Sequence, residues 1–308
     1  MALSKTALVT GAHGFIGRHV ARAYAAAGYT VTGIGHGSWD YDEYAQFGLT
    51  FWHTADIGLE SLVTYAGKPD VIVHCAGSGS VAFSMEQPYQ DYVRTVANAA
   101  AVLEFVRLHS PKTVVVYPSS AAVYGTVDSV PIAESAPLRP ASPYGTHKVM
   151  AEELFQSYAR HFGLSAVVVR FFSIYGQGLR KQLLWDACRK MDDGDFTFFG
   201  TGGEIRDWLH VQDAASLLMA VAGRASAACP VFNGGTGTGV TNADLLAQLL
   251  QAKGLQGNVA FSGASRGGDP SRYVADNRRA LELGWAPRIA LADGLQTYVQ
   301  WFKGQRLA

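Results

Sequence analysis

The chain has 308 residues, of which 48% are hydrophobic and 16% charged, and its 25 Lys and Arg balance its 25 Asp and Glu. This length and apolar content suit one large core or two coupled domains and exclude a disordered or fibrous protein. Because the net charge is zero, no overall field attracts nucleic acid or an anionic membrane, so an anionic ligand must be held by local groups.

The sequence indicates a cytoplasmic protein without a membrane segment or a metal site. No apolar run of signal-peptide length precedes the first glycine, and no uncharged apolar stretch reaches the roughly 18 residues needed to cross a bilayer. Its three cysteines, Cys75, Cys188 and Cys229, show neither a CxxC pair nor Cys/His ligand spacing. We therefore predict free buried thiols in a reducing compartment.

Apolar runs and helical patterns alternate along the first 176 residues. Strands are expected at Thr6–Thr10, Thr30–Ile34, Leu49–Trp52, Val71–Cys75, Thr113–Tyr117 and Ala166–Phe172. Helices are expected at Gly14–Ala27, Gly58–Tyr65, Tyr89–Leu108 and Pro143–Phe162. This alternation predicts an α/β fold with a doubly wound parallel sheet, the Rossmann arrangement.

The alternation changes after Gly176, where a smaller C-terminal lobe is expected. We predict a dinucleotide-binding domain over residues 1–176, a second lobe over 177–206 and 236–308, and a return of 207–235 to the first domain. The later elements expected are a helix, a strand and a last helical pair at Val211–Ala222, Pro230–Asn233, Asn242–Ala252 and Leu291–Phe302.

Three glycines join the first strand to the first helix. Gly11, Gly14 and Gly17 stand at positions 1, 4 and 7 of this turn, and a helical stretch follows directly. Such a turn brings free backbone N–H groups and the positive end of the helix dipole together, which favours a pyrophosphate. Glycine turns are common, so this pattern alone predicts only a phosphate site.

A second motif adds redox chemistry. Tyr144 and Lys148 are four residues apart in a helical pattern and so share a helix face, and Ser119-Ser120 ends the fifth predicted strand. A fixed ammonium near a phenol stabilises the phenolate, so we predict a lowered pKa for Tyr144. Such a tyrosine exchanges a proton with a sugar hydroxyl or ketone.

These motifs, in this order, resemble the extended short-chain dehydrogenase/reductase family, in particular its nucleotide-sugar epimerases and dehydratases. The resemblance runs almost end to end and implies Ser120, Tyr144 and Lys148 as catalytic residues. It implies cofactor contacts at Gly11, His13, Gly14, Phe15, Ile16, Gly35, His36, Asp56, Ile57, Ala76, Gly77, Ser119, Tyr144, Lys148 and Phe171.

The resemblance also implies that the second lobe binds a nucleotide sugar. Arg206 lies in Arg-Asp-Trp-Leu-His-Val and Arg266 in Arg-Gly-Gly-Asp, two elements whose arginines grip the substrate diphosphate in relatives. Guanidinium groups suit phosphate oxygens because they form paired hydrogen bonds and keep their charge. The implied substrate-binding residues are Ser120, Tyr144, Ser173, Arg206 and Arg266.

The implied activity is 4-epimerisation of a nucleotide sugar through a transient 4-keto sugar. Ala121 and Ala122 occupy the places where dehydratases of the family carry acids, which argues against 4,6-dehydration. An NADPH-dependent reductase of a 4-keto-6-deoxy nucleotide sugar is the alternative. A non-catalytic cofactor-binding sensor is the remote alternative, because such proteins typically lose the tyrosine and lysine.

The sequence leaves the cofactor open between NAD and NADP. NAD-preferring relatives end the second strand with an acid that binds the adenosine ribose, whereas this chain has Gly35, followed by His36 and Ser38. Loss of the acid removes repulsion against a 2′-phosphate, and Arg18 is a further nearby cation. Relatives commonly dimerise through a four-helix contact, which implies a homodimer formed by Tyr89–Leu108 and Pro143–Phe162.

Overall fold

A seven-stranded parallel sheet forms the centre of the computed structural model, which describes residues 5–127, 129–264 and 272–305. The strand order is β10-β6-β5-β4-β1-β2-β3, with every neighbouring pair parallel. The strands are β1 (Thr6–Thr10), β2 (Thr30–Gly35), β3 (Phe51–Thr54), β4 (Val71–His74), β5 (Val114–Ser120), β6 (Ala166–Phe171) and β10 (Val231–Gly234).

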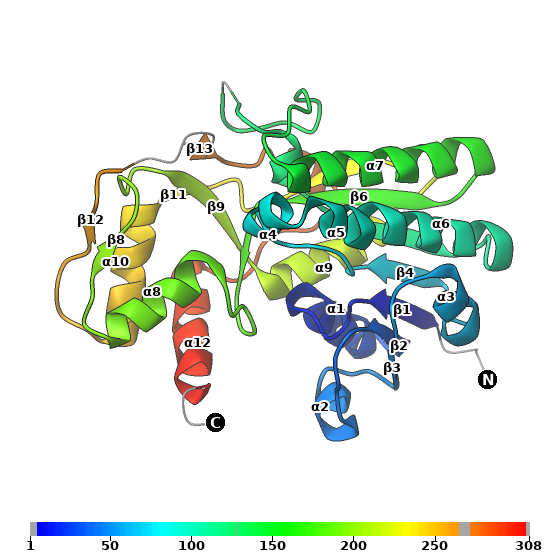
Figure 1. The fold of residues 1–308 in the computed structure, drawn as a ribbon, viewed down its shortest axis with the longest axis horizontal. Coiled ribbons are helices and arrows are strands. Elements are labelled where there is room, and N and C mark those ends of the chain that lie inside the picture. Colours follow the sequence, from blue (N-terminus) through cyan, green and yellow to red (C-terminus); the bar gives the residue numbers. More distant parts are fainter. Residues whose placement is uncertain (1–4, 128, 265–271, 306–308) are drawn as a thin grey trace.

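Helices cover both faces of this sheet (Figure 1). One apolar cluster joins the sheet to α1 (Phe15–Ala26) and α9 (Val211–Ala222), and a second joins it to α3 (Leu59–Tyr65), α6 (Asn98–His109) and α7 (Pro143–Phe162). The central strands β4 and β6 are buried at every residue, as expected for valine-rich strands with helices on both sides. The predicted doubly wound α/β fold is confirmed.

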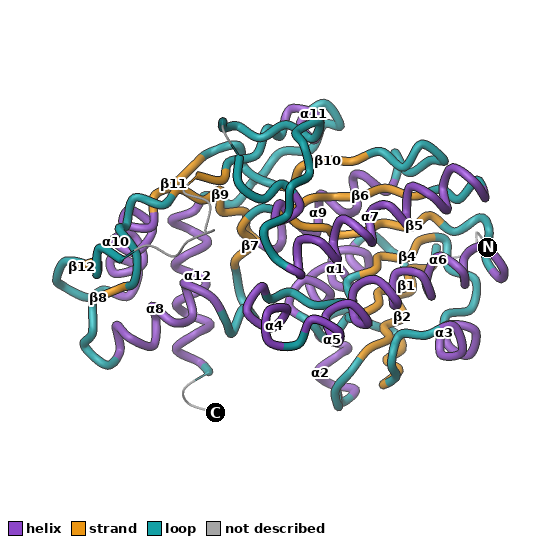
Figure 2. Tube along the Cα trace, turned by 45° about the horizontal axis from the view of Figure 1, so that its top comes forward, coloured by secondary structure: helices purple, strands orange, loops and turns teal. Residues whose placement is uncertain are grey.

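Several short helices accompany these elements. They are α2 (Tyr41–Gln46), α4 (Val81–Glu86), α5 (Pro88–Tyr92), the 3₁₀ turn η2 (Ala121–Val123) and α11 (Arg278–Leu281). The predicted helix Tyr89–Leu108 is present as α5 and α6 joined by a π-helical turn, η1 (Val93–Ala97). Figure 2 shows α4 and α5 close to the first turns of α7.

The second lobe lies beside the carboxyl ends of the strands (Figure 1). A small sheet contains β7 (Ser173–Tyr175), β9 (Ile205–His210), β11 (Gly239–Thr241) and β13 (Arg272–Tyr273), and a strand pair contains β8 (Thr197–Phe198) and β12 (Ala260–Phe261). The helices α8 (Gln182–Asp192), α10 (Asn242–Lys253) and α12 (Leu291–Gly304) pack around a third apolar cluster.

The segment 207–235, which was predicted to return to the first domain, is divided between the large sheet and the small sheet. α9 packs on α1, and β10 pairs with β6 as the outermost strand of the large sheet, whereas β9 belongs to the small sheet. Asp207 on β9 is fully buried and accepts hydrogen bonds from backbone N–H groups of Thr236, Gly237 and Ala275. This carboxylate therefore ties β9 to the chain that follows β10 and to the segment after β13.

Several features differ from the predicted elements. β5 extends to Ser120, beyond the predicted end at Tyr117, although Pro118 lacks an N–H. β3 lies two residues later than predicted, at Phe51–Thr54. The short helices α2 and α4, and α8 with its mixed basic sequence, were not predicted. No helix in the described ranges is both long and apolar enough to cross a membrane.

Candidate active site

The glycine turn between β1 and α1 is tightly packed against the end of β4. Gly11 has a φ of +67°, and a Cβ placed on it would lie 2.7 Å from the amide nitrogen of Ala76. A Cβ on Gly17 would lie 2.2 Å from the carbonyl oxygen of Gly11. These positions require glycine for conformation and for space.

The first turn of α1 has free N–H groups. Gly14 is its N-cap and provides no side-chain acceptor, and the first turn holds no acidic residue. An anion placed before this helix meets unsatisfied N–H donors and the positive end of the dipole. The turn therefore fits the pyrophosphate of a dinucleotide, and the contacts predicted for Gly11, Gly14, Phe15 and Ile16 remain predictions.

Aromatic rings and a guanidinium flank the glycine turn. The His13 ring packs on Trp39, with centroids 4.8 Å apart, and burial lowers the pKa of His13. Arg18 donates to the carbonyl oxygen of His13 at 2.6 Å and lies over the Trp39 ring. The guanidinium therefore stands directly beside the predicted dinucleotide turn.

The end of β2 differs from an acid-bearing ribose site. A Cβ on Gly35 would lie 3.2 Å from the Trp52 ring and 3.3 Å from the Cα of Gly11, so the turn and Trp52 pack closely here. The exposed His36 and Asp56 approach each other to 3.1 Å between Nδ1 and Oδ1, whereas the neighbouring Ile57 is buried. Two residues predicted to contact the cofactor thus lie side by side.

The three predicted catalytic residues come together where β5 ends and α7 begins. Ser120 is the N-cap of η2, and its hydroxyl accepts from the Ala122 N–H at 3.2 Å. A hydrogen bond from Ser120 acts to lower the pKa of the Tyr144 phenol. Lys148 places its Nζ 5.9 Å from the Tyr144 ring centroid and donates to Tyr117 Oη and Pro118 O, each at 3.2 Å.

The structure contradicts the lowered pKa predicted for Tyr144. Burial raises the pKa of Tyr144, and the negative charge of Asp91 raises it further. The opposing hydrogen bond comes from Ser120 rather than Lys148. Burial lowers the pKa of Lys148 to about 8, because an ammonium loses hydration inside the protein. The spacing of Tyr144 and Lys148 predicted that the two side chains lie together, but it did not predict their burial. Burial has the largest effect on the pKa of both groups.

A polar cluster lies beneath Lys148. Thr10 Oγ1 and His74 Nδ1 are 2.7 Å apart, and Thr10 Oγ1 also accepts from the Ala76 N–H at 3.3 Å. The His74 ring stacks on Tyr117, whose hydroxyl holds Lys148. Burial lowers the pKa of His74 to about 3, so this imidazole is neutral. No pattern in the sequence predicted this support, because His74 lies within an apolar strand segment.

Ser119, predicted to contact the cofactor, has its hydroxyl in an interior network instead. It donates to Glu152 at 2.5 Å, and Glu152 pairs with Arg170 at 2.7 Å. Arg170 also donates to Tyr124, which donates to Asn233 at 2.7 Å. Phe171 is likewise buried, and a Cβ on Gly234 would clash with its ring. Any cofactor contact by Ser119 must come from its backbone.

The contacts predicted for Ala76, Gly77, Ser173 and Arg206 remain predictions, and Arg266 lies outside the described residues. Ala76 and Gly77 directly follow β4 at the carboxyl end of the sheet, where ligands bind in open α/β folds. Ser173 begins β7, which pairs with β9, and Arg206 on β9 is half-buried. The described side chains form no Arg206–carboxylate ion pair, which leaves its guanidinium available to an anion.

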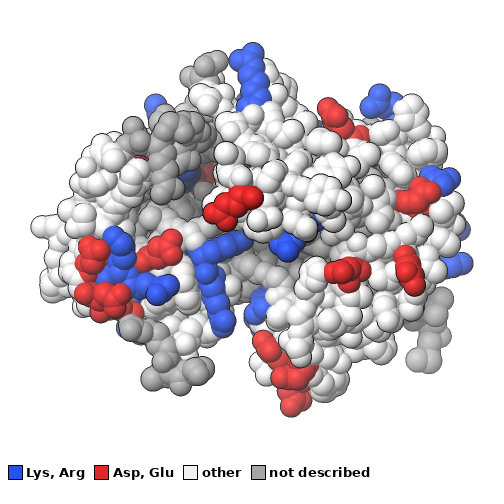
Figure 3. Space-filling model, viewed as in Figure 1, with Lys and Arg blue, Asp and Glu red and all other residues white. Residues whose placement is uncertain are grey.

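Basic side chains border the hollow between the two parts of the molecule (Figure 3). Sequence reasoning did not select Lys181, the N-cap of α8, which reaches across to the first domain and donates to the Gly79 carbonyl at 3.0 Å. The loop before it approaches the dinucleotide turn, since a Cβ on Gly178 would lie 3.7 Å from Cδ of Arg18. The second lobe thus brings cations to the predicted cleft.

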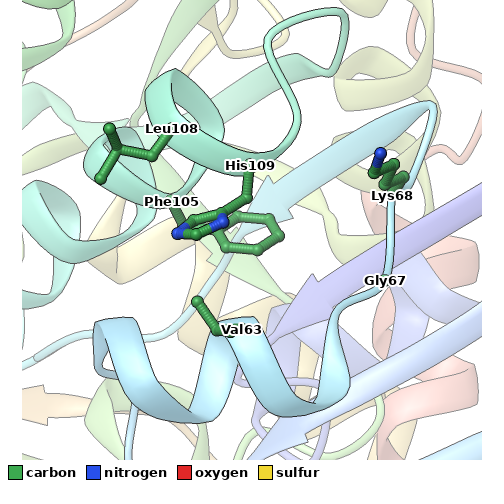
Figure 4. Close-up of a pocket in the computed structure, with 6 residues that line it drawn as sticks. All are labelled: Val63, Gly67, Lys68, Phe105, Leu108 and His109. Carbon is green, nitrogen blue, oxygen red and sulfur yellow. The ribbon is translucent and has the colours of Figure 1, made fainter.

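An open pocket of about 410 Å³ lies elsewhere, between α3 and α6 (Figure 4). It is lined by Val63, Gly67, Lys68, Phe105, Leu108 and His109. Gly67 and Lys68 precede β4, and His109 precedes β5, so this pocket is at the amino ends of the strands. It is therefore separate from the cleft at their carboxyl ends. Within the described ranges, no His, Cys, Asp and Glu gather in a group that could hold a metal.

The sheet order, the glycine turn and the Ser120–Tyr144–Lys148 cluster define a dinucleotide-dependent enzyme of the short-chain dehydrogenase/reductase type. A family model described as the NAD dependent epimerase/dehydratase family matches residues 7–235. The chain belongs to this family, in the extended branch of that enzyme class, and the cofactor of the family is NAD.

Known relatives cover nearly the whole chain. A UDP-glucose 4-epimerase of Azospirillum brasilense is 32% identical over 96% of this chain and 90% of its own. UDP-glucose 4-epimerase of Thermotoga maritima, solved with UDP-glucose, has a TM-score of 0.87 at 26% identity, covering 98% and 99% of the two chains. A dTDP-glucose 4,6-dehydratase double mutant of Streptomyces venezuelae, solved with NAD, has a TM-score of 0.87 at 28% identity, covering 97% of each.

Proposed function

We propose that this protein is a nucleotide-sugar 4-epimerase. The observation that carries the proposal is the cluster of Ser120, Tyr144 and Lys148 beside a dinucleotide turn, with alanines after the serine. Ala121 is buried, and a Cβ on Gly145 would lie 2.7 Å from the Ala122 carbonyl oxygen. Ala121 and Ala122 therefore supply no acid or base for removing water from the sugar, which supports epimerisation over the dehydration carried out by some relatives.

The chain's own residues divide the work of proton transfer. Tyr144 takes the proton of the sugar 4-hydroxyl and later returns it, and Ser120 hydrogen-bonds the reacting oxygen. Lys148 holds the ribose next to the nicotinamide and favours the phenolate by its charge. When bound, the dinucleotide supplies hydride transfer at C4. Arg206, together with Arg266, binds the diphosphate.

Fitness for a dinucleotide is supported by the first turn of α1, where Gly14 provides no side-chain acceptor and no acidic residue opposes an anion. We also propose residues 1–176, with 207–235 returning, as the dinucleotide domain, and 177–206 with 236–308 as the nucleotide-sugar lobe. Other predicted contacts, including His13, His36, Asp56, Ile57, Ala76, Gly77 and Ser173, are proposed on their places around this cleft.

A reductase that uses NADPH is the second candidate, supported by the end of β2. Gly35 provides no carboxylate to repel a 2′-phosphate, and Arg18 and His36 lie near the turn. The non-catalytic sensor is disfavoured because the three side chains of the catalytic cluster are all present and adjacent.

Purified protein separates these functions. Interconversion of UDP-glucose and UDP-galactose, or of another UDP- or dTDP-hexose pair, without added cofactor supports the epimerase. Consumption of added NADPH only with a 4-keto nucleotide sugar would replace it with the reductase. Tight dinucleotide binding with no turnover across the substrate panel would favour the sensor.

We further propose a homodimer formed by α5, α6 and α7. Exposed apolar side chains occur on these helices and on the adjacent α4; they are Met85, Tyr89, Tyr92, Leu108, Met150 and Phe162. Association of two copies would remove this area from water. Light scattering should give twice the chain mass, and Tyr89→Glu should shift it toward one chain mass.

A further inference from the structure

Two oxygens of β5 hold the ammonium of Lys148. This side chain is only 6% exposed, and its Nζ donates to Oη of Tyr117 and to the carbonyl oxygen of Pro118, each at 3.2 Å. A lysine ammonium has three N–H donors. Strand β5 therefore takes two of them, and one remains for a ligand.

The phenol of Tyr117 is fixed by the rings around it. It stacks on Phe155 of α7, with centroids 4.6 Å apart, and on His74 of β4, with centroids 5.9 Å apart. His74 is itself held by Thr10, at 2.7 Å between Nδ1 and Oγ1. The ring of Tyr117 also lies under the ammonium of Lys148, whose Nζ is 4.8 Å from its centroid. Oη of Tyr117 is thus a buried acceptor that is held in place independently of Lys148.

Two carboxylates act on Lys148 from other positions, Glu152 on α7 and Asp91 on α5. Their negative charges oppose the lowering that burial imposes on the pKa of Lys148. Each carboxylate has a partner of its own, since Glu152 lies 2.7 Å from Arg170 and Asp91 lies 2.5 Å from His147. Within the described ranges neither carboxylate forms an ion pair with Lys148. The direct contacts of its ammonium are therefore those with β5.

The other ionisable groups around Lys148 are uncharged at the pH where it titrates. Burial lowers the pKa of Lys148 to about 8 and that of His74 to about 3, and it raises the pKa of Cys75 to about 12. Burial also raises the pKa of both phenols, Tyr144 and Tyr117. Near pH 8, Tyr117 is therefore a neutral hydroxyl whose oxygen accepts from the ammonium.

This hydrogen bond favours the charged form of Lys148. A hydrogen bond to an ionised group is about twice as strong as one between neutral groups. The phenol can donate its own hydrogen to a neutral amine, but that bond is weaker than the one that its oxygen accepts from the ammonium. Oη of Tyr117 therefore offsets part of the hydration that Lys148 loses on burial.

We propose that Tyr117 is a positioning residue for Lys148, whose hydroxyl holds the ammonium against β5 and stabilises its charge. The third N–H of the ammonium is then left for the ribose of the cofactor. The effect of Tyr117 on turnover rests on the proposed epimerase function, whereas its effect on Lys148 does not. A role in packing alone would need only the ring of Tyr117, so the hydroxyl distinguishes the two roles.

The test uses the full chain with NAD and the variant Tyr117→Phe, which keeps the ring and removes the hydroxyl. The lysines are isotopically labelled at Cε and titrated by NMR, and the resonance of Lys148 is the one missing from Lys148→Arg. Without the phenolic acceptor the ammonium is less stable, so Lys148 should titrate at lower pH by on the order of 1 pH unit. Where the parent epimerises a sugar, the fall in kcat/KM at alkaline pH should move to lower pH by the same amount.

Tyr298→Phe is the matched control. Tyr298 is a buried tyrosine of α12 whose hydroxyl donates to the Leu179 carbonyl oxygen at 2.8 Å, so its loss removes a buried hydrogen bond far from Lys148 in the chain. This variant should leave the titration of Lys148 unchanged. An unchanged titration in Tyr117→Phe, a shift to higher pH, or an equal shift in both variants would overturn the proposal. If no sugar is epimerised, the proposed function fails, while the NMR titration still decides the role of Tyr117.

Discussion

At the scale of single residues, Tyr144 is the side chain on which the chemistry depends. Its phenol lies with Ser120 and Lys148 where β5 ends and α7 begins, and loss of hydration there raises its pKa. Removing only the hydroxyl, in Tyr144→Phe, should lower turnover by about 10²–10⁴-fold, which is the usual contribution of a positioned acid or base. Equilibrium binding of NAD should remain nearly unchanged. Turnover equal to that of the parent would contradict the proton-transfer role.

Lys148 limits kcat/KM at alkaline pH. Burial lowers its pKa to about 8, so the side chain is an ammonium below that pH and loses its charge above it. Since the neutral amine no longer favours the phenolate or holds the ribose, kcat/KM should fall about tenfold for each pH unit above the titration. Lys148→Arg keeps its charge and should remove this alkaline limb, whatever its residual activity. If the fall in kcat/KM at alkaline pH persists in Lys148→Arg, the titration of another group causes it.

The sequence predicted the catalytic residues because their spacing follows helix geometry, and it missed their surroundings because burial has no local signature. Asp91 lies in the polar segment Pro88–Tyr92, where an acid usually faces water, yet it is buried. His74 and Tyr117 read as ordinary strand residues. Only the packing of distant elements shows that they support Lys148.

At the scale of elements, helix α7 and strands β5 and β6 hold the site through a buried ion pair. Arg170 and Glu152 are 4% and 1% exposed, and their charges meet at 2.7 Å. Arg170→Met would leave Glu152 as an uncompensated buried charge, so it should lower the free energy of unfolding by about 3–5 kcal/mol. Urea unfolding measures the loss.

The matched control is the exposed pair of Lys190 and Asp195, whose side chains are 46% and 47% exposed. Lys190→Met should cost less than about 1 kcal/mol, because water screens the pair and solvates either charge alone. Equal losses in the two variants would show that the interior network does not hold β5, β6 and α7 together.

Element prediction succeeded where apolar periodicity was strong and failed where a special residue intervened. The expected helix Pro143–Phe162 matches α7 at both ends, since Ser142 caps its start and Gly163 adopts the left-handed conformation at its end. β5 is longer than predicted because Pro118, which has no N–H to donate, still fits within the strand. The carbonyl oxygen of Pro118 accepts a hydrogen bond from Lys148. The sequence pattern did not predict the π-helical turn η1, because the pattern was interpreted with the period of an α-helix alone.

At the scale of the whole molecule, function depends on how the second lobe faces the carboxyl edge of the sheet. Lys181 joins the two parts across the hollow, through the Gly79 carbonyl, and partial burial lowers its pKa. We propose that Lys181 and Arg206 bring positive charge to the nucleotide diphosphate, in a chain with no net charge. The lobe arrangement, not composition, concentrates this charge.

Lys181→Met therefore tests the assembled cleft. Because the ammonium contacts no residue of the catalytic cluster, the variant should raise KM for the nucleotide sugar about tenfold, equivalent to one charge-assisted hydrogen bond, with kcat changed far less. Added salt should weaken substrate binding more in the parent than in the variant, since one cation has been removed. Lys190→Met, on the same helix but bonded to Thr197 and Asp195, is the control and should leave KM unchanged. A fall in kcat without a change in KM would instead show that Lys181 acts by holding the two lobes together.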